Sequence, residues 1–191
     1  MRWVLVFIVT LSACAQTPTR VSSHRVQTET SGPAKSAQPA ICPSFASWDR
    51  TGTKLISSQD LLAQQSGTVL LFFASWCDQC GPQLRQLSTA FGAEGQAGLV
   101  VVLSGERYGK AKAKLDRIEA ELGRKLLVVE DGSQEVSRLF GVCEENDVET
   151  ACSLPAIRVC GDDARQLLAL HGAQEDLVAK IQAVLPAVTT P

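Results

Sequence analysis

A Cys-x-x-Cys pair directly after an apolar run constrains the fold of this chain more than any other feature. The run Val69–Phe73 is continuously apolar, as expected for a strand covered on both faces of a sheet. Trp76, Cys77 and Cys80 follow it and open a segment with helically spaced apolar residues that continues through Phe91. The two thiols are therefore expected where a buried strand turns into a helix, with Cys77 at the helix N-terminus.

Such a position suits thiol chemistry. At a helix N-terminus, unpaired backbone N–H groups and the positive end of the helix dipole favour a thiolate, which is the form that attacks disulfides. Cys80 lies one helical turn beyond Cys77 and is close enough to resolve a mixed disulfide. The alternative is a structural disulfide or half of a metal site, but the 2 histidines, His24 and His171, have no ligand spacing to the pair. We expect no metal and no cofactor.

Composition limits the other function classes. The chain has 191 residues with 18 basic and 20 acidic side chains, for a formal net charge of -2. This balance gives no global field that would attract nucleic acid or an anionic membrane surface. With 45% hydrophobic and 20% charged residues, the sequence predicts one ordinary globular domain together with some non-globular sequence.

The N-terminus predicts export and lipid anchoring. Residues 1–13 carry Arg2 and a short apolar run that is typical of a signal peptide and too short to span a bilayer as a stable helix. Leu-Ser-Ala-Cys at positions 11–14 resembles the lipobox of bacterial lipoproteins, which implies that Cys14 is lipidated and becomes the new N-terminus. Because Ala15 and not aspartate follows, that resemblance favours the outer membrane. An ordinary signal peptide with an incidental cysteine is the alternative.

Two further parts follow the signal peptide. Residues 14–41 are rich in Ser, Thr, Gln, Ala and Pro and show no apolar periodicity, so they cannot bury enough surface to offset the entropy of the chain. We expect a disordered tether there. Residues 42–191 are expected to form the folded domain.

An exported chain meets an oxidising compartment, where cysteines serve in disulfides, lipid anchors or redox sites. Of the 7 cysteines, four remain after Cys14, Cys77 and Cys80 are assigned: Cys42, Cys143, Cys152 and Cys160. We favour a Cys143–Cys152 bridge, because it staples the acidic, apolar-poor segment between them, and closing about ten residues is worth roughly 2.7 kcal/mol in the chain-entropy model. Cys42–Cys160 follows by elimination. The alternative is that some of the four remain free and buried.

Apolar patterning predicts an α/β domain with a mixed sheet. Strands are expected over 68–75, 98–103 and 126–129, helices over 110–122, 133–140 and 175–185, and a hairpin over 154–159 and 166–170. Alternation of strands and helices followed by a hairpin indicates this class. The segment 105–110 superficially suggests a phosphate loop, but its spacing is too short and Ala111 stands where Ser or Thr is needed, so we reject that interpretation.

Two segments resemble the thioredoxin-like superfamily. Phe73–Cys80 looks like its active-site segment, and Ser153–Pro155, just ahead of the hairpin, looks like its cis-proline loop. Further residues resemble the N-terminal extension of the TlpA-like branch, which comprises membrane-tethered thiol-disulfide oxidoreductases of the bacterial cell envelope: Pro43, Phe45, Gly52 and Leu61. The resemblance runs from residue 42 to 185. It implies a thioredoxin-like fold, with a central mixed β-sheet flanked by helices and an N-terminal extension.

The resemblance also implies roles for individual residues. Cys77 would be the attacking thiolate and Cys80 the resolving thiol. Trp76, Leu154 and Pro155 would contact the substrate, with Pro155 in a cis peptide bond. A simple packing role is the alternative for Trp76, and an ordinary trans turn is the alternative for Pro155.

The sequence departs from the family where protons are moved. Leu71 stands where thioredoxins place a buried acid, and Gln83 where TlpA-like reductases often carry a glutamate. Deprotonation of Cys80 would then depend on water, on Glu106 or on a group that the sequence does not reveal. Asp78 beside Cys77 disfavours the thiolate by like-charge repulsion, which favours a reductant over an oxidant.

The predicted function is a lipid-anchored, periplasm-facing thiol-disulfide oxidoreductase of the bacterial cell envelope. Its partners would be protein thiol or disulfide substrates and an upstream membrane electron donor, and we expect a monomer that does not bind nucleic acid. The alternatives are a binding or chaperone module with a permanently oxidised pair, a thiol peroxidase and, more remotely, a copper carrier. The acidic residues between Cys143 and Cys152 would either select a basic partner or keep an exposed loop soluble.

Overall fold

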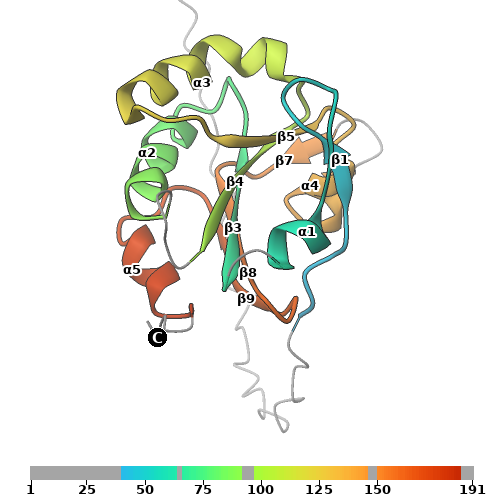
Figure 1. The fold of residues 1–191 in the computed structure, drawn as a ribbon, viewed down its shortest axis with the longest axis vertical. Helices are drawn as coiled ribbons and strands as arrows, with labels where there is room; N and C mark the ends of the chain where they lie inside the picture. Colours follow the sequence, from blue (N-terminus) through green and yellow to red (C-terminus); the bar gives the residue numbers. More distant parts are fainter. Residues whose placement is uncertain (1–39, 64–65, 92–96, 146–149, 186–191) are drawn as a thin grey trace, which may run out of the picture. The chain divides into compact units, whose positions relative to one another are not determined.

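A computed structural model describes residues 40–63, 66–91, 97–145 and 150–185 (Figure 1). These residues lie within one compact unit that begins at Ala37. The predicted signal peptide, the predicted lipidation site Cys14 and nearly all of the predicted tether lie outside the described residues. Within the described ranges, no helix is long and apolar enough to cross a membrane.

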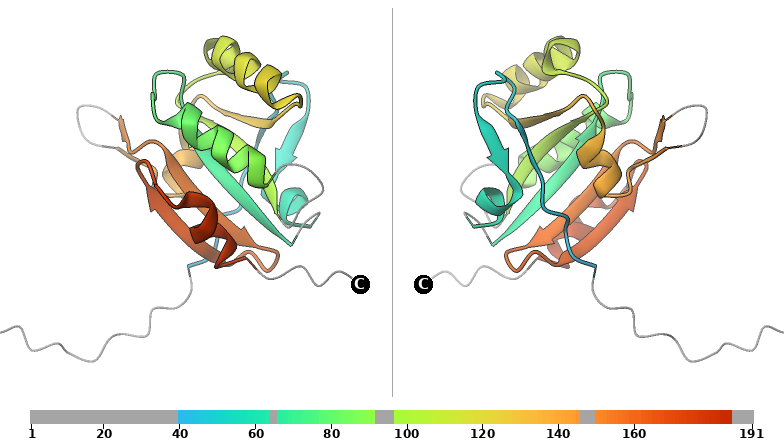
Figure 2. Two further views of the ribbon diagram at one scale, coloured as in Figure 1. Left: turned by 90° about the vertical axis from the view of Figure 1, so that its left-hand side faces the viewer. Right: turned by 90° about the vertical axis from the view of Figure 1, so that its right-hand side faces the viewer.

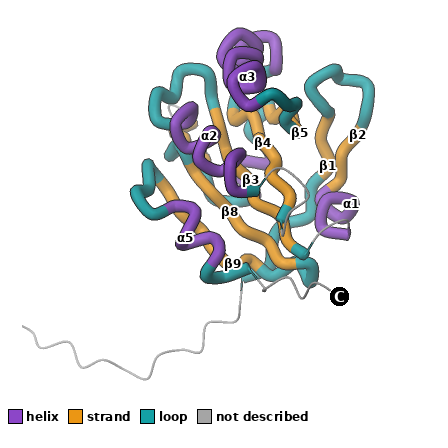
Figure 3. The backbone as a smooth tube through the Cα atoms, turned by 60° about the vertical axis from the view of Figure 1, so that its left-hand side comes forward, coloured by secondary structure: helices purple, strands orange, loops and turns teal. Residues whose placement is uncertain are grey.

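The centre of the domain is a five-stranded mixed sheet in the order β5-β4-β3-β8-β9. The strands are β3 (Gly67–Phe73), β4 (Gly98–Ser104), β5 (Leu127–Asp131), β8 (Ala156–Gly161) and β9 (Gln166–His171). β3, β4 and β5 run parallel, whereas β8 pairs antiparallel with both β3 and β9. Figure 3 shows the strands side by side across the molecule. The predicted fold class is therefore confirmed.

Helices cover both faces of this sheet. They are α1 (Ser58–Ala63), α2 (Cys80–Ala90), α3 (Tyr108–Leu122), α4 (Glu135–Leu139) and α5 (Leu177–Gln182). In Figure 2, α2 and α5 stand in front of the sheet in the left view, and α1 and α4 stand in front in the right view. The five predicted strands and four predicted helices are present, with bounds that differ by a few residues at their ends.

The side chains of β3 divide between two hydrophobic cores because successive residues of a strand point to opposite faces. Val69, Leu71 and Phe73 pack into the core beneath α2, α3 and α5, whereas Leu70 and Phe72 pack into the core on the α1 and α4 side. All seven residues of β3 are buried. This explains why the strand is a continuous apolar run in the sequence.

Four short strands were not predicted. β1 (Ala46–Trp48) and β2 (Leu55–Ser57) form an antiparallel hairpin, and β6 (Cys143–Glu145) and β7 (Thr150–Cys152) form another. Each has only 3 residues, which is too short for a period-two pattern to stand out against loop sequence. A backbone bridge from Asp49 to Val129 attaches the first hairpin to the edge of the central sheet beside β5.

The four remaining described cysteines form two disulfides. Cys42 is bonded to Cys160 of β8 across a sequence separation of 118, and Cys143 is bonded to Cys152, directly opposite it in the β6–β7 ladder. The first bond ties the start of the described chain to the central sheet. The second closes the hairpin that leads into residues 153–155.

We expect the long-range disulfide to contribute more to stability than the short-range one. In the chain-entropy model, closing a loop of 118 residues is worth about 4.9 kcal/mol, against about 2.7 kcal/mol for the Cys143–Cys152 loop. Urea unfolding of Cys42→Ala/Cys160→Ala and Cys143→Ala/Cys152→Ala should therefore rank the free energies of unfolding in this order. A larger loss for the short loop would show that the bonds act through native contacts and not through chain entropy.

Candidate active site

The cysteine pair lies at the carboxyl end of β3, in the centre of the sheet. The backbone N–H of Cys77 donates to the carbonyl of Ala74 at 3.2 Å, and that of Cys80 donates to the carbonyl of Cys77 at 3.3 Å. These turns delay the helix, so that α2 begins at Cys80. The prediction that Cys77 occupies the helix N-terminus was therefore wrong by one turn: Cys77 precedes the helix and Cys80 is its first residue.

The two sulfurs form a disulfide with an S–S distance of 2.06 Å and differ in accessibility. Cys77 retains 5% of its surface, Cys80 is fully buried, and the neighbouring Trp76 is 64% exposed. Of the two residues, only Cys77 therefore offers any surface to a disulfide or thiol of another protein. Trp76 extends the surface on which such a partner would rest.

The segment Ser153–Pro155 leads into β8, which flanks β3 on the side opposite to β4. The Leu154–Pro155 peptide bond is cis, which is the geometry that the family resemblance implies. β8 begins immediately afterwards, with Ala156 opposite Phe72 of β3, so the proline stands beside the end of the strand that leads to Cys77. The loop is fixed at both ends, since the carbonyl of Pro155 accepts from Gly172 N–H at 2.8 Å and Ser153 N–H donates to Val142 at 2.9 Å.

The buried guanidinium of Arg158 helps to fix the position of this loop through His171. Arg158 of β8 is 3% exposed, and its guanidinium donates to the carbonyls of Phe140 and Leu170 at 2.9 and 3.1 Å and to Nε2 of His171 at 2.8 Å. Burial, followed by the charge of Arg158, lowers the pKa of His171, so this ring is neutral at pH 7 and its Nε2 accepts. The ring also bonds the carbonyl of Ser153. A polar chain thus connects the end of α4 to the cis-proline loop.

Two charged side chains hold the loop between β3 and α2. Glu106, which follows β4 and is 5% exposed, accepts from the N–H of Ser75 at 2.5 Å and from its Oγ at 2.7 Å. Lys114 of α3 donates to the carbonyls of Ser75 and Cys77 at 3.1 and 2.7 Å. The carboxylate of Glu106 accepts hydrogen bonds from the N–H and hydroxyl of Ser75, and the ammonium of Lys114 donates to the carbonyls of Ser75 and Cys77. Together these bonds position the backbone of Cys77.

The structure shows the surroundings of the three residues considered above for the deprotonation of Cys80. Leu71 lies in the hydrophobic core. The amide of Gln83 is engaged with the backbone of Gln174, at 3.0 and 3.3 Å. Both carboxylate oxygens of Glu106 accept hydrogen bonds from Ser75, so the role that the structure shows for Glu106 is to position the loop. Sequence reasoning missed Lys114, because a lysine in a helix with a charged face carries no signal that one of its contacts is a distant active-site loop.

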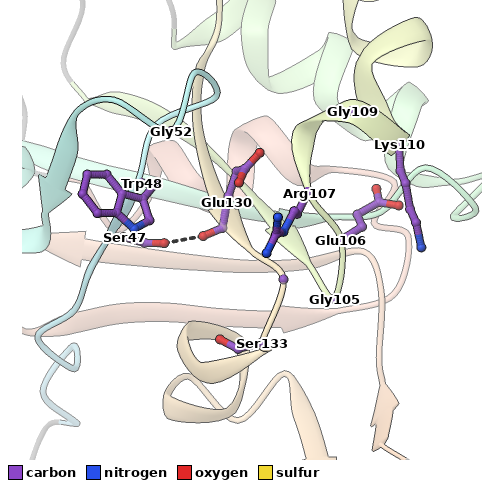
Figure 4. Close-up of a pocket in the computed structure, with 11 residues that line it drawn as sticks. Ser47, Trp48, Gly52, Gly105, Glu106, Arg107, Gly109, Lys110, Glu130 and Ser133 are labelled. Carbon is purple, nitrogen blue, oxygen red and sulfur yellow. Dashed lines mark hydrogen bonds between the residues drawn. The ribbon is translucent and has the colours of Figure 1, made fainter.

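A groove adjoins this site along the same edge of the sheet (Figure 4). Its volume is about 960 Å³, and it is lined by residues that follow β4, by residues at and after the end of β5 and by one end of the β1–β2 hairpin: Ser47, Trp48, Gly52, Gly105, Glu106, Arg107, Gly109, Lys110, Glu130, Gly132 and Ser133. Glu106 lines the groove and also accepts hydrogen bonds from Ser75 of the cysteine loop. The residues of the rejected phosphate-loop interpretation form one wall of it.

Comparison with known proteins places this geometry in a family. Residues 40–166 match the AhpC/TSA family. No curated protein matches the sequence significantly. Among solved structures, peroxidoxin BcpB from Mycobacterium tuberculosis is 18% identical with a TM-score of 0.60, covering 78% of this chain and 97% of its own.

Two thiol-disulfide proteins are similar to the same extent. A thiol:disulfide interchange protein of the thioredoxin family from Chlorobium tepidum is 20% identical with a TM-score of 0.57, covering 78% of this chain and 99% of its own. A secreted Mycobacterium tuberculosis disulfide oxidoreductase homologous to E. coli DsbE is 16% identical with a TM-score of 0.55, covering 73% and 95%. Likeness at these identities concerns the fold. With its cysteine pair at the end of β3 and residues 40–166 matched, the chain belongs to the AhpC/TSA family, a thioredoxin-like family of thiol-disulfide oxidoreductases and peroxidases.

Proposed function

We propose that this protein is a thiol-disulfide oxidoreductase that reduces disulfides of cell-envelope proteins through Cys77 and Cys80. The observation that carries the proposal is the arrangement at the end of β3, where a disulfide joins the slightly exposed Cys77 to the fully buried Cys80 beside a cis proline. The export signal and the lipobox at Cys14 support a periplasm-facing anchor, with the outer membrane favoured.

The reaction follows from the two accessibilities. In the reduced protein, the thiolate of Cys77 attacks one sulfur of a client disulfide, forms a mixed disulfide and releases the other client sulfur as a thiolate that takes a proton. Cys80 then loses its proton and attacks the sulfur of Cys77, which releases the second client thiol and leaves the Cys77–Cys80 disulfide. Two electrons and two protons from an upstream membrane donor restore the dithiol.

Lys114 supports the first step electrostatically. Its ammonium is 2.7 Å from the carbonyl oxygen of Cys77 and 5.4 Å from the ring centroid of Phe73. Within the described part of the chain, no carboxylate forms an ion pair with it. A cation this close favours the thiolate over the thiol. Its effect opposes that of the exposed Asp78, which follows Cys77 in the sequence.

A thiol peroxidase is the second candidate, because the AhpC/TSA family includes peroxidases and the fold is similar to that of peroxidoxin BcpB. In that reaction the Cys77 thiolate would attack a peroxide oxygen, release water or an alcohol and become a sulfenic acid, which the Cys80 thiol would condense to the same disulfide with loss of water. The two functions share the cysteines and differ in the oxidant. Consumption of hydrogen peroxide by the reduced protein, compared with reduction of insulin, separates them.

The cysteines should differ in what their removal does. In an insulin assay with dithiothreitol, Cys77→Ser should abolish activity, since no attacking thiolate remains. Cys80→Ser should accumulate a mixed disulfide with the client, which is seen as a band on a non-reducing gel that disappears on reduction. Insulin reduction that survives in Cys77→Ser would contradict the proposed roles, and a wild-type protein inactive on insulin but rapid with peroxide would favour the peroxidase.

Replacing Lys114 should make Cys77 ionise at higher pH. We expect the pH profile of iodoacetamide alkylation of the reduced protein to move up by about two units in Lys114→Met, because a unit charge roughly 6 Å from the sulfur at an effective dielectric near 20 contributes about 2.8 kcal/mol. Lys112→Met is the matched control, because Lys112 lies on the same helix but pairs with Asp116. Identical profiles in both variants would remove the electrostatic role of Lys114.

The reduction potential should be nearer to that of thioredoxin, about -270 mV, than to that of strongly oxidising periplasmic enzymes, about -120 mV. Asp78 adjoins Cys77 and destabilises its thiolate, so Asp78→Asn should make the potential less negative, whereas Asp162→Asn in a distant exposed turn should not change it. Equilibration with glutathione measures both. A value above about -150 mV would overturn the assignment as a reductant.

A further inference from the structure

The groove lined by the residues given above, here called the β4–β5 groove, extends the cysteine site in one direction. β4 lies next to β3 and β5 lies beyond it, so the carboxyl ends of the three strands follow one another along one edge of the sheet. Glu106 faces the groove while its carboxylate holds Ser75, two residues before Cys77. A chain that reached Cys77 could therefore continue into the groove, on the side opposite the cis proline.

Glycines keep this groove open. Gly105, Gly109 and Gly132 line it without side chains. A Cβ at Gly105 would lie 2.6 Å from the Gln134 side chain, and the φ of +74° disfavours any other residue there, whereas a Cβ at Gly109 would meet nothing within 4 Å. The groove is thus shaped by the absence of side chains, and position 109 offers a place to fill it.

The exposed charged side chains that line the groove are both positive. Arg107 and Lys110 are both exposed and, within the described residues, belong to no ion pair. Of the two acids, Glu106 is buried against Ser75, and Glu130 is half-buried with one carboxylate oxygen accepting from the N–H of Tyr108 at 2.7 Å. Figure 4 shows Arg107 between Trp48 at one end of the groove and Lys110 at the other. The N-terminus of α3, at Tyr108, adds the positive end of a helix dipole.

We propose that the β4–β5 groove binds an acidic polypeptide segment of the client next to the disulfide that Cys77 attacks. Arg107 and Lys110 would meet its carboxylates, and Trp48, half-exposed at the far end, would supply an apolar contact. The inference rests on the proposed function and names the class of substrate. It also assigns client selection to the basic side of the active site and not to the acidic β6–β7 hairpin.

The first test compares two disulfide peptides that differ only in their flanking residues, several glutamates in one and several lysines in the other. The reduced protein should react about tenfold faster with the acidic peptide at low salt, and the ratio should shrink at about 0.5 M salt, because exposed charges act mainly on association and are screened. Arg107→Glu/Lys110→Glu should invert the ratio. Arg117→Glu, on an exposed position of the same helix outside the groove, should leave it unchanged.

A binding experiment separates this inference from the redox assignment. In oxidised protein that cannot exchange, a cysteine-free acidic peptide should shift the NMR signal of the Trp48 indole N–H. The shift should weaken in Gly109→Phe, which adds a bulky side chain to the groove at a position where a Cβ would meet nothing within 4 Å. Equal rates for both peptides, or a ratio that survives Arg107→Glu/Lys110→Glu, overturns the groove while exchange itself persists. Absence of exchange with every disulfide, together with acidic-peptide binding at Trp48, overturns the proposed function and leaves the groove as a site.

Discussion

The burial of β3 is the constraint on which the rest of the structure depends. Its side chains fill both hydrophobic cores at once, so neither face of the strand can shift without a loss of packing. Because β4 and β8 flank it, the loop that leaves its carboxyl end is placed between the loop of Glu106 and the cis-proline loop. The reactive sulfur is therefore located by the most deeply buried element of the domain, and the residues around it, Glu106 and Lys114, only complete a position that the sheet has already set.

The active site combines rigid support with a small opening. The turn that carries Cys77 is hydrogen-bonded on its donor side by Glu106 and on its acceptor side by Lys114, and the opposing loop is secured by Arg158 through His171. Among the described residues, no carboxylate pairs with Arg158, so its charge is distributed over backbone carbonyls, including that of Phe140 at the end of α4, where the helix dipole is negative. Such an arrangement lets thiol chemistry proceed at Cys77 while the surrounding backbone keeps its geometry.

Long-range apolar patterning made most of the fold predictable, and local context made the rest hard to predict. The strands of the central sheet and the helices that cover it repeat apolar residues over enough positions to be read, and Gly123 ends α3 in the left-handed conformation expected of a C-cap. The pair Cys77 and Cys80 was found from its place after β3. The exact start of α2 was not, because the turn at Ala74–Cys77 forms through backbone hydrogen bonds that leave no residue pattern. Lys114, Arg158 and the groove depend on contacts between segments far apart in the chain, for which the sequence carries no periodic signal.

The bond between Cys42 and Cys160 has a mechanical consequence. Cys42 stands at the very start of the described chain, ahead of the β1–β2 hairpin, and Cys160 lies within a central strand. A force applied to the chain at residue 40 is therefore transmitted through the disulfide into β8. The β1–β2 hairpin, which follows Cys42 in the sequence, does not carry this force and does not unfold under it. A domain held from that side can bear load at its attachment point without losing the edge at which Trp48 and Cys77 are presented.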